Sequence, residues 1–471
     1  MKPIIPLTLA IAMIACQNQP ATAEGAPQEE MPAVESRHPE WVKSANIYEV
    51  NIRQYSAEGT IAAFEAHLPR LKEMGVDILW IMPVQPIGVV NRKVEEGADL
   101  GSYYSISDYT AVHPDYGTVE DFKRMVEKAH SMGMKVILDW VANHTAWDHH
   151  WVKEHPEFYT ANAEGQQPIV ALDNDGNSTD WSDVADLNYN EPGLHEAMFQ
   201  EMAWWIQECN IDGFRCDVAG FVPIDFWNNT RPKLEAIKPI FMLAEWEDPA
   251  HMQAFNMNYG WEFHHILNEV AKGAQGIEEI AAYLHKNDSL YSKDDIRMYF
   301  TTNHDENSWN GTVFERMGEQ HFNMFVIAST LPGMPLIYSG QEAGLDHRLS
   351  FFGKDEINWS DIRFKDFYTR MLALKHENPA LWNANWGGDL ELLEVGTDEV
   401  LAYKRSNGSN EVLVFVNLSK ENSHTLDLSN AAFEGEYEVV LANLPAEWEV
   451  SVRLKDGLKL GPNTHAIYVR Q

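Results

Sequence analysis

The chain has 471 residues, of which 45% are hydrophobic and 23% charged, so it is long enough for a barrel with smaller satellites and apolar enough for a large core. Asp and Glu total 71 against 35 Lys and Arg, which gives a formal net charge of -36. A charge of this sign disfavours a nucleic-acid partner and leaves neutral ligands as the better expectation, although solubility in a salty medium explains it equally well.

The first 16 residues predict an export signal that is not part of the fold. A basic start is followed by an apolar stretch, residues 4–15, which is too short to span a bilayer. The segment MIAC, ending in Cys16, resembles a bacterial lipobox, in which the cysteine is acylated; ordinary secretion is the alternative, because Met13 stands where such motifs usually carry Leu. Residues 17–40, rich in Pro, Ala, Gln and Glu, predict a disordered tether. We therefore expect an exported lipoprotein that faces the periplasm or the cell surface.

From residue 41 to residue 380 the pattern alternates between strand and helix. Runs typical of strands cover residues 45–55, 77–84, 134–141, 213–219, 239–246, 254–258, 297–305 and 334–342. Helical periodicity covers residues 60–74, 119–132, 196–207, 318–331 and 361–375. This alternation predicts an α/β fold, a (β/α)8 TIM barrel, because no Gly-rich phosphate turn follows an early strand as the doubly wound alternative requires.

Two segments interrupt the alternation. Residues 143–192 follow the third strand, are rich in Asp, Asn, His and Trp, and predict a small domain inserted over the barrel mouth. Residues 385–471 consist of short alternating runs separated by Gly, Asn and Asp turns, which predict a C-terminal antiparallel β-sandwich. No transmembrane helix is visible in the sequence.

Two cysteines remain beyond the signal. Cys216 stands between Arg215 and Asp217 on a predicted strand, so it faces the helix layer if they face the barrel mouth. We expect Cys209 and Cys216 to be buried free thiols, and no Cys/His spacing typical of a metal site occurs.

Acidic residues end several of the predicted barrel strands. GFRCD ends in Asp217, TTNHD ends in Asp305, MLAEW contains Glu245 and LDWVANH contains Asp139. Barrel active sites are built where strands open into loops. Each acid alone is more often a surface carboxylate, but acids at the ends of the third, fourth, fifth and seventh strands are hard to explain as solvated charge.

The neighbours of these acids indicate different tasks. Arg215 lies two residues before Asp217, so both side chains face the same way, and a fixed cation favours the ionised carboxylate that a nucleophile needs. Glu245 follows an apolar run, which raises a carboxyl pKa and suits a general acid. His304 beside Asp305 offers hydrogen bonds to neighbouring hydroxyls of one sugar.

The segments DWVANH, GFRCD, MLAEW and TTNHD resemble the four sequence motifs of the α-amylase superfamily, glycoside hydrolase family 13, in that family's order, and VADLN at residues 184–188 resembles a fifth. The resemblance covers roughly residues 40–471 and implies hydrolysis with retention of the α-anomer. By match to the motifs, Asp217 would be the nucleophile, Glu245 the acid/base, and Asp305 the residue that grips substrate hydroxyls and stabilises the transition state. A retaining glycosidase needs two carboxyl groups about 5–5.5 Å apart, which opposed strand ends can supply.

The resemblance also implies a set of residues that bind the reacting glucose. These are Tyr104, Asp139, His144, Arg215, His304 and Trp246. Tyr104 matches a tyrosine that stacks on this glucose, and Tyr103 is the competing choice. Tryptophans in or beside the predicted mouth loops are candidates for stacking on sugars or for packing: Trp140, Trp147, Trp181, Trp246, Trp261 and Trp309.

The chemistry requires no cofactor, but the resemblance raises the question of a structural calcium ion. In this family the residue matching Asn143 is often a ligand of a calcium that joins the inserted domain to the barrel. Oxygen donors lie nearby in the segment DNDGN, at residues 173–177, although such segments are more often plain turns.

Departures from the family pattern limit the substrate prediction. Many endo-acting α-amylases have Lys-His where this chain has Gly220 and Phe221, and VADLN is closer to the QPDLN form of oligo-1,6-glucosidases than to LPDLD. We expect an α-amylase-type hydrolase of α-1,4-linked glucans and maltooligosaccharides. The alternatives are an exo-acting α-glucosidase, including α-1,6 activity, a transglycosylase on the same scaffold, or an inactive glucan-binding lipoprotein. The intact acids disfavour the last, and the sequence does not indicate an oligomeric state.

Overall fold

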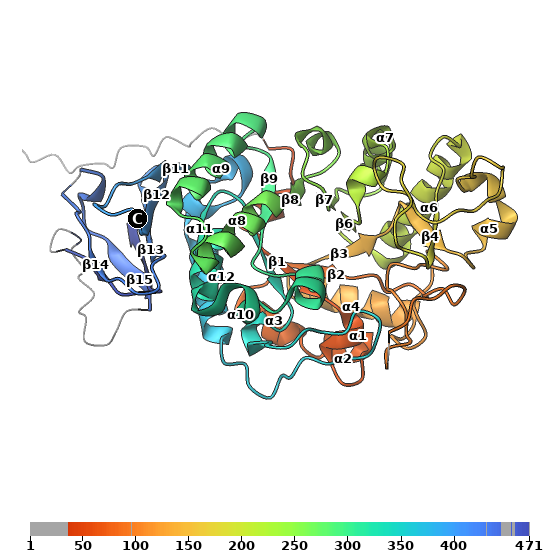
Figure 1. Ribbon diagram of the computed structural model, residues 1–471, viewed down its shortest axis with the longest axis horizontal. Helices are drawn as coiled ribbons and strands as arrows, with labels where there is room; N and C mark the ends of the chain where they lie inside the picture. Colours follow the sequence, from red (N-terminus) through yellow and green to blue (C-terminus); the bar gives the residue numbers. More distant parts are fainter. Residues whose placement is uncertain (1–35, 96, 430, 444–453, 455–456, 471) are drawn as a thin grey trace, which may run out of the picture. The chain divides into compact units, whose positions relative to one another are not determined.

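The centre of the fold is a closed barrel of parallel strands in the order β1-β10-β9-β8-β7-β6-β3-β2 (Figure 1). The computed structural model describes residues 36–95, 97–429, 431–443, 454 and 457–470, so the predicted export signal with Cys16 lies outside the described residues. The barrel strands are β1 (Ile47–Val50), β2 (Ile78–Ile81), β3 (Lys135–Trp140), β6 (Gly213–Cys216), β7 (Phe241–Ala244), β8 (Met257–Tyr259), β9 (Ile296–Tyr299) and β10 (Met334–Tyr338). The predicted (β/α)8 barrel is confirmed.

Helices connect and cover these strands. They are α1 (Ile52–Tyr55), α2 (Ile61–Glu65), α3 (Leu68–Met74), α4 (Val119–Ser131), α5 (Trp151–Glu154), α6 (Pro192–Cys209), α7 (Ile224–Glu235), α8 (Trp261–Lys272), α9 (Ile277–Leu290), α10 (Val313–Met317), α11 (His321–Thr330) and α12 (Lys365–Glu377). Within the described residues, none of the helices combines the length and apolar character needed to cross a membrane.

Side chains along each barrel strand alternate between two hydrophobic clusters. Ile47, Ile137 and Leu243 belong to the cluster inside the barrel, whereas Tyr48 and Leu138 belong to the cluster under the helices. Because this alternation has a period of two, the residue two positions beyond an interior residue also faces the barrel axis. That rule decides which side chains reach the barrel mouth.

Two predicted elements near the N-terminus differ from the structure. The predicted strand over residues 45–55 ends at Val50, because the chain turns there into α1, whose Gln54 amide donates to the carbonyl oxygen of Ser350 at 2.5 Å. The predicted helix over residues 60–74 is split into α2 and α3. Pro69 explains the split, since its ring clashes with the carbonyl group four residues earlier, at Glu65, where α2 ends.

The folded body begins earlier than residue 41, where the sequence placed it. Arg37 donates a hydrogen bond to the carbonyl oxygen of Met252 at 2.6 Å, and the ring of His38 bonds the carbonyl oxygen of Asp294 at 2.6 Å. Residues 36–40 therefore pack on the barrel and are not part of a tether.

The two segments that interrupt the alternation fold as small β units. The inserted segment pairs β4 (His144–Ala146) with β5 (Val184–Asp186). The C-terminal antiparallel sheet has the order β11-β12-β13-β17-β15, from β11 (Asp389–Leu392), β12 (Val400–Asn407), β13 (Asn410–Asn417), β17 (His465–Arg470) and β15 (Glu438–Ala442). A second pair joins β14 (His424–Thr425) to β16 (Lys459–Leu460). The predicted C-terminal β-domain is confirmed.

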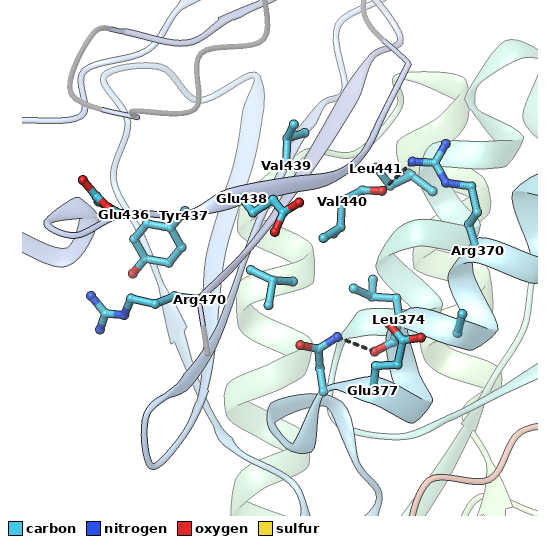
Figure 2. A pocket seen from close by; sticks show the side chains of 13 residues that line it. Arg370, Leu374, Glu377, Glu436, Tyr437, Glu438, Val439, Val440, Leu441 and Arg470 are labelled. Carbon is cyan, nitrogen blue, oxygen red and sulfur yellow. Dashed lines mark hydrogen bonds between the residues drawn. The ribbon is translucent and has the colours of Figure 1, made fainter.

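A cavity of about 940 Å³ lies between α12 and β15 (Figure 2). Arg370 of α12 crosses its edge and donates a hydrogen bond to the carbonyl oxygen of Val440 in β15. None of the predicted site residues lines this cavity, so it is not the candidate active site. Cys209 and Cys216 are buried and free, as predicted.

Candidate active site

The acids reach the barrel mouth because of their position in the strand alternation. Ile137 and Leu243 point into the barrel, so Asp139 and Glu245, two residues further on, point the same way. Asp217 follows the last residue of β6 and lies beside Arg215, whose Nη1 donates to Asp217 Oδ1 at 2.8 Å. The strand-end acids that the sequence singled out therefore converge.

A cavity of about 490 Å³ opens at this end of the barrel. Six of the predicted site residues line it: Tyr104, His144, Asp217, Glu245, His304 and Asp305. Its apolar lining includes Trp181, Trp309, Phe351 and Phe352. Two of the six tryptophans named as stacking candidates are thus in place to meet a sugar, and Trp309 is 48% exposed.

Arg215 joins three carboxylates beneath this cavity. Its Nη1 donates to Asp139 Oδ1 at 2.9 Å as well as to Asp217, and its Nη2 lies 2.9 Å from Glu245 Oε2. Asp139 and Arg215 are both 0% exposed and do not line the cavity, so in this structure neither offers surface to a sugar, and direct binding by either stays a prediction. Because they are buried behind the acids, they hold the acids in place.

The surroundings separate the pKa values of Asp217 and Glu245. Burial raises the pKa of Asp217 to about 6, although the charge of Arg215 lowers it. The effect of Arg215 has the predicted sign, but burial outweighs it. Burial also raises the pKa of Glu245 to about 8, and the charges of Asp217 and Asp305 add to that rise. Between these values Asp217 is ionised and Glu245 is protonated.

Tyr104 and His304 form another part of the site. Their rings stack with centroids 5.6 Å apart, and the Tyr104 hydroxyl lies 2.8 Å from His304 Nε2. His304 Nε2 is also 3.3 Å from Asp305 Oδ2. Tyr103, the competing choice, accepts a hydrogen bond from Asn51 and lies outside the cavity lining.

The loop after β6 places aromatic rings next to the acids. Val218 has a φ of 36°, a strained value for a β-branched residue, and its N–H donates to Glu245 Oε2 at 2.7 Å. Phe221 stacks on Trp181 with centroids 6.1 Å apart and meets Trp246 edge to face at 5.6 Å. Trp246 packs here and is not among the residues that line the cavity, so its contact with a sugar stays a prediction.

The described side chains around Asn143 give little support to a calcium ion. The Asn143 amide lies 3.2 Å from His144 Nδ1, and burial lowers the pKa of His144 to about 3, which keeps that ring neutral. Asp173 Oδ1 accepts backbone hydrogen bonds from Asp175 and Asn177, as a turn does. Within the described ranges no group of three or more His, Cys, Asp or Glu side chains could hold a metal.

Sequence reasoning missed three residues that complete the site from β1, β2 and β8: Glu49, Trp80 and Tyr259. Trp80 Nε1 donates to Asp139 Oδ2 at 3.1 Å, and Arg215 Nε donates to the Tyr259 hydroxyl at 3.2 Å. Each lies at an interior position of its strand, so the alternation was the signal available in the sequence.

Comparisons with known sequences agree with this geometry. The sequence model described as alpha amylase, catalytic domain, matches residues 36–386. Alpha-amylase 3 of Dictyoglomus thermophilum is 24% identical over 482 residues, which cover 86% of this chain and 94% of that protein. A Rhodospirillum rubrum alpha-1,4-glucan:maltose-1-phosphate maltosyltransferase is 28% identical over 408 residues, 79% of this chain and 56% of that protein. Alpha-amylase MalA of Haloarcula japonica is 26% identical, and 56% of its length is matched. The chain therefore spans little more than half the length of several curated relatives.

Solved structures of alpha-amylases are also similar to this chain. An alpha-amylase from Lactobacillus plantarum superposes with a TM-score of 0.78 at 28% identity, over 92% of this chain and 100% of that one. The maltogenic alpha-amylase AmyB of Thermotoga neapolitana superposes with a TM-score of 0.75 at 28% identity, over 91% of this chain and 97% of that one.

Proposed function

Because this chain belongs to the α-amylase family, glycoside hydrolase family 13, we propose that it is a retaining hydrolase of α-1,4-glucosidic bonds in starch-like glucans and maltooligosaccharides. The observation that carries the proposal is the arrangement of Asp217 and Glu245 on one guanidinium, that of Arg215, with Asp305 lining the same cavity. Sharing one guanidinium through neighbouring nitrogens is compatible with the separation of about 5–5.5 Å that a retaining pair needs.

In the first step Asp217, ionised, attacks the anomeric carbon of the bound glucose while Glu245 gives its proton to the glycosidic oxygen. The raised pKa of Glu245, about 8, keeps that proton in place at neutral pH. The Val218 N–H, 2.7 Å from Glu245 Oε2, orients the carboxyl group and can stabilise the charge that remains after proton transfer. The bond to the leaving sugar breaks as the bond to Asp217 forms.

In the second step a water molecule takes the place of the leaving sugar. Glu245, now ionised, accepts a proton from this water, whose oxygen attacks the anomeric carbon and releases Asp217. Asp305 and His304 hold the sugar hydroxyls from the other side of the cavity. Two inversions at one carbon return the α-anomer.

The proposal is tested by incubating the protein with starch, pullulan, maltooligosaccharides and isomaltose and following product sizes over time. We expect short maltooligosaccharides from starch, released as the α-anomer by proton NMR at early times, and a loss of at least about 100-fold in kcat for Asp217→Asn. No reducing ends from any substrate, with Asp217→Asn indistinguishable from wild type, would contradict the proposal.

A second candidate is an exo-acting or transferring enzyme on the same scaffold. It is favoured by the loop after β6, where Gly220 and Phe221 replace the Lys-His of many endo-acting relatives. The Phe221 and Trp181 rings form an apolar pair, and Trp181 lines the cavity, which favours a sugar acceptor over water. Glucose as the sole product from the first time point would support exo action, and products longer than the substrate would support transfer.

We also propose export and anchoring through a lipid on Cys16, supported by the composition of residues 1–16. Wild-type protein is expected in the membrane fraction after expression in a bacterial host fed an alkyne-labelled fatty acid. The Cys16→Ser variant is expected without label and in the soluble fraction. Label on both variants, or on neither, would contradict the anchor.

A further inference from the structure

Glu49 is an acid of the barrel interior that the reaction described above does not use. It stands third in the short strand β1, IYEV, whose other residues are uncharged, and it is 0% exposed. A buried carboxylate is costly unless other groups compensate its charge. The partner it has in the structure is 255 residues away in the chain, at the site itself.

That partner is His304. Glu49 Oε1 lies 2.5 Å from His304 Nδ1, while the other ring nitrogen, Nε2, lies 2.8 Å from the Tyr104 hydroxyl and 3.3 Å from Asp305 Oδ2. Oxygen atoms thus face both nitrogens, and two of the three residues that supply them are acids. A doubly protonated ring satisfies both directions at once, since each nitrogen then donates.

We propose that Glu49 is a positioning residue of this active site: its carboxylate holds His304 as an imidazolium, which in turn fixes Tyr104 and Asp305 against the sugar under attack. The part of this inference that concerns the sugar rests on the proposed function, whereas the ion pair between Glu49 and His304 does not depend on it. With Nε2–H donating, the Tyr104 hydroxyl is free to donate to Asp139 Oδ2, 3.2 Å away. The network then runs from β1 through His304 to the acids that Arg215 binds.

The charges around the ring agree with this assignment. The groups that face His304 are Glu49 from β1, Asp305 after β9, Tyr104 after β2, Asp139 from β3 and Arg215 from β6. Burial lowers the pKa of His304, but the negative charges of Asp305 and Glu49 outweigh it and raise the pKa to about 9. Without the charge of Glu49, burial and Arg215 would be opposed only by the charges of Asp305 and Asp139.

Glu49→Gln tests the charge, because it keeps the shape of the side chain. We expect kcat to fall about 10- to 100-fold on maltooligosaccharides, with a smaller change in KM, because misplaced groups weaken the transition state more than the ground state. In wild type Glu245, with a pKa of about 8, sets the basic limb of the kcat/KM profile. If the pKa of His304 falls from about 9 by about 1–3 units, deprotonation of His304 moves that limb down by up to about 2 pH units. Glu49→Asp restores the charge and is expected to return most of that shift.

The matched control is Glu342→Gln. Glu342 is also 0% exposed, but it accepts hydrogen bonds from Tyr48 at 2.6 Å and Arg70 at 2.8 Å and does not contact the site. We expect this variant to lower the melting temperature and to leave the basic limb in place. If Glu49→Gln lowers activity equally at every pH, as Glu342→Gln would, Glu49 is only structural and the proposal is overturned.

A measurement on wild-type protein keeps the inference testable even if Glu49→Gln does not fold or no α-glucan is cleaved. Protein labelled with carbon-13 at histidine is titrated by NMR, and the His304 signal is identified by its absence in His304→Asn. We expect the wild-type signal to titrate above about pH 8, within the range of charge-induced shifts, and about 1–3 units lower in Glu49→Gln. Titration of wild-type His304 below pH 7 would overturn the proposal, whereas failure of all substrates would overturn only the proposed function.

Discussion

Asp217 and Glu245 share the guanidinium of Arg215 but differ in what else surrounds them, and this difference sets the pH range of the reaction. Asp217 must be ionised and Glu245 protonated, and their pKa values are about 6 and about 8. We therefore predict a bell-shaped profile of kcat/KM with its maximum between these values. Initial rates on a maltooligosaccharide from pH 4.5 to 9.5 check this, and a flat profile across that range would contradict the assignment.

The raised pKa of Glu245 supports activity but lowers stability. Folding raises the pKa of Glu245 from its usual 4.5 to about 8, so between these values the folded chain holds a proton that the unfolded chain releases. Stability therefore falls as pH rises through this window, and below pH 4.5 there is no cost. Glu245→Gln removes this cost. We predict a melting temperature at pH 7.5 that is higher than wild type by at least about 1 °C, a gain of about 1 kcal/mol or more, with little gain at pH 4.5.

A calorimetric series over pH measures this effect, with Glu342→Gln as the control because Glu342 is a buried acid outside the site. A gain for Glu245→Gln that is the same at every pH would show that its cause is not the proton. Activity is expected to fall at least about 100-fold in the same variant.

At the scale of elements, the loop after β6 depends on one glycine. A Cβ added to Gly220 would lie 2.0 Å from the Trp246 ring, and that ring also packs on Phe221. Gly220→Ala must therefore displace Trp246, and we predict a loss of about 1–3 kcal/mol in the free energy of unfolding. This packing also explains why a lysine is absent at this position.

The control for Gly220→Ala is Gly193→Ala in the first turn of α6, where the added Cβ would come no closer than 3.1 Å to Phe158. Alanine is the better helix former, so this variant is expected to be neutral within about 1 kcal/mol. Urea denaturation of both proteins gives the comparison. If Gly220→Ala and Gly193→Ala had the same free energy of unfolding, the loop after β6 would accommodate the added methyl group without loss of stability.

The inserted segment gives a second prediction at this scale. Since the side chains near Asn143 bond each other and the Asp173 carboxylate is used in its own turn, we expect this segment to hold without calcium. We predict that EDTA leaves the melting temperature unchanged. A decrease that added calcium reverses would show that a bound ion joins the segment to the barrel.

The sequence predicts those features of the elements that neighbouring residues determine and misses those that depend on distant contacts. The strand ends before Asp217 and Glu245 could be predicted because short apolar runs precede them, whereas β9 ends at Tyr299 and Asp305 lies in the segment beyond it. The split of the predicted helix at Pro69 also has a local cause and could have been anticipated. The alternation of β1 could have placed Glu49 inside the barrel, but its role depends on His304, a contact that no local pattern encodes.

The burial of Asp139 and Arg215 could not be predicted either. A motif places both residues at the barrel mouth, but the layer that each occupies depends on the register of β3 against β6, in which Asp139 pairs with Arg215. Register is a property of the closed barrel rather than of either segment. The sequence therefore identified the members of the site more reliably than their depth.

At the scale of the whole molecule, one set of side chains of the C-terminal sheet shares a hydrophobic cluster with the helices around the barrel, while the sheet also has a cluster of its own. Tyr403 and Val414 of the sheet belong to the same buried cluster as Phe325 of α11. The Tyr403 hydroxyl lies 2.6 Å from Thr330 Oγ1, and the buried Arg405 donates to the Thr330 carbonyl oxygen at 2.9 Å. The sheet therefore completes the packing of the barrel helices and is not an appended module.

This shared cluster predicts that the two parts unfold together. Calorimetry of the full chain should give a single transition, and a variant that ends at Trp386 should be insoluble or unfolded, because Phe325 and Thr330 would then face water. Tyr403→Phe is the milder variant: it removes one buried hydrogen bond, so we expect a loss of about 0.5–1.5 kcal/mol while the transition stays single. Two separate transitions in the full chain, or a soluble and active fragment of residues 36–386, would contradict this coupling, since either result requires a barrel core that is complete without the sheet.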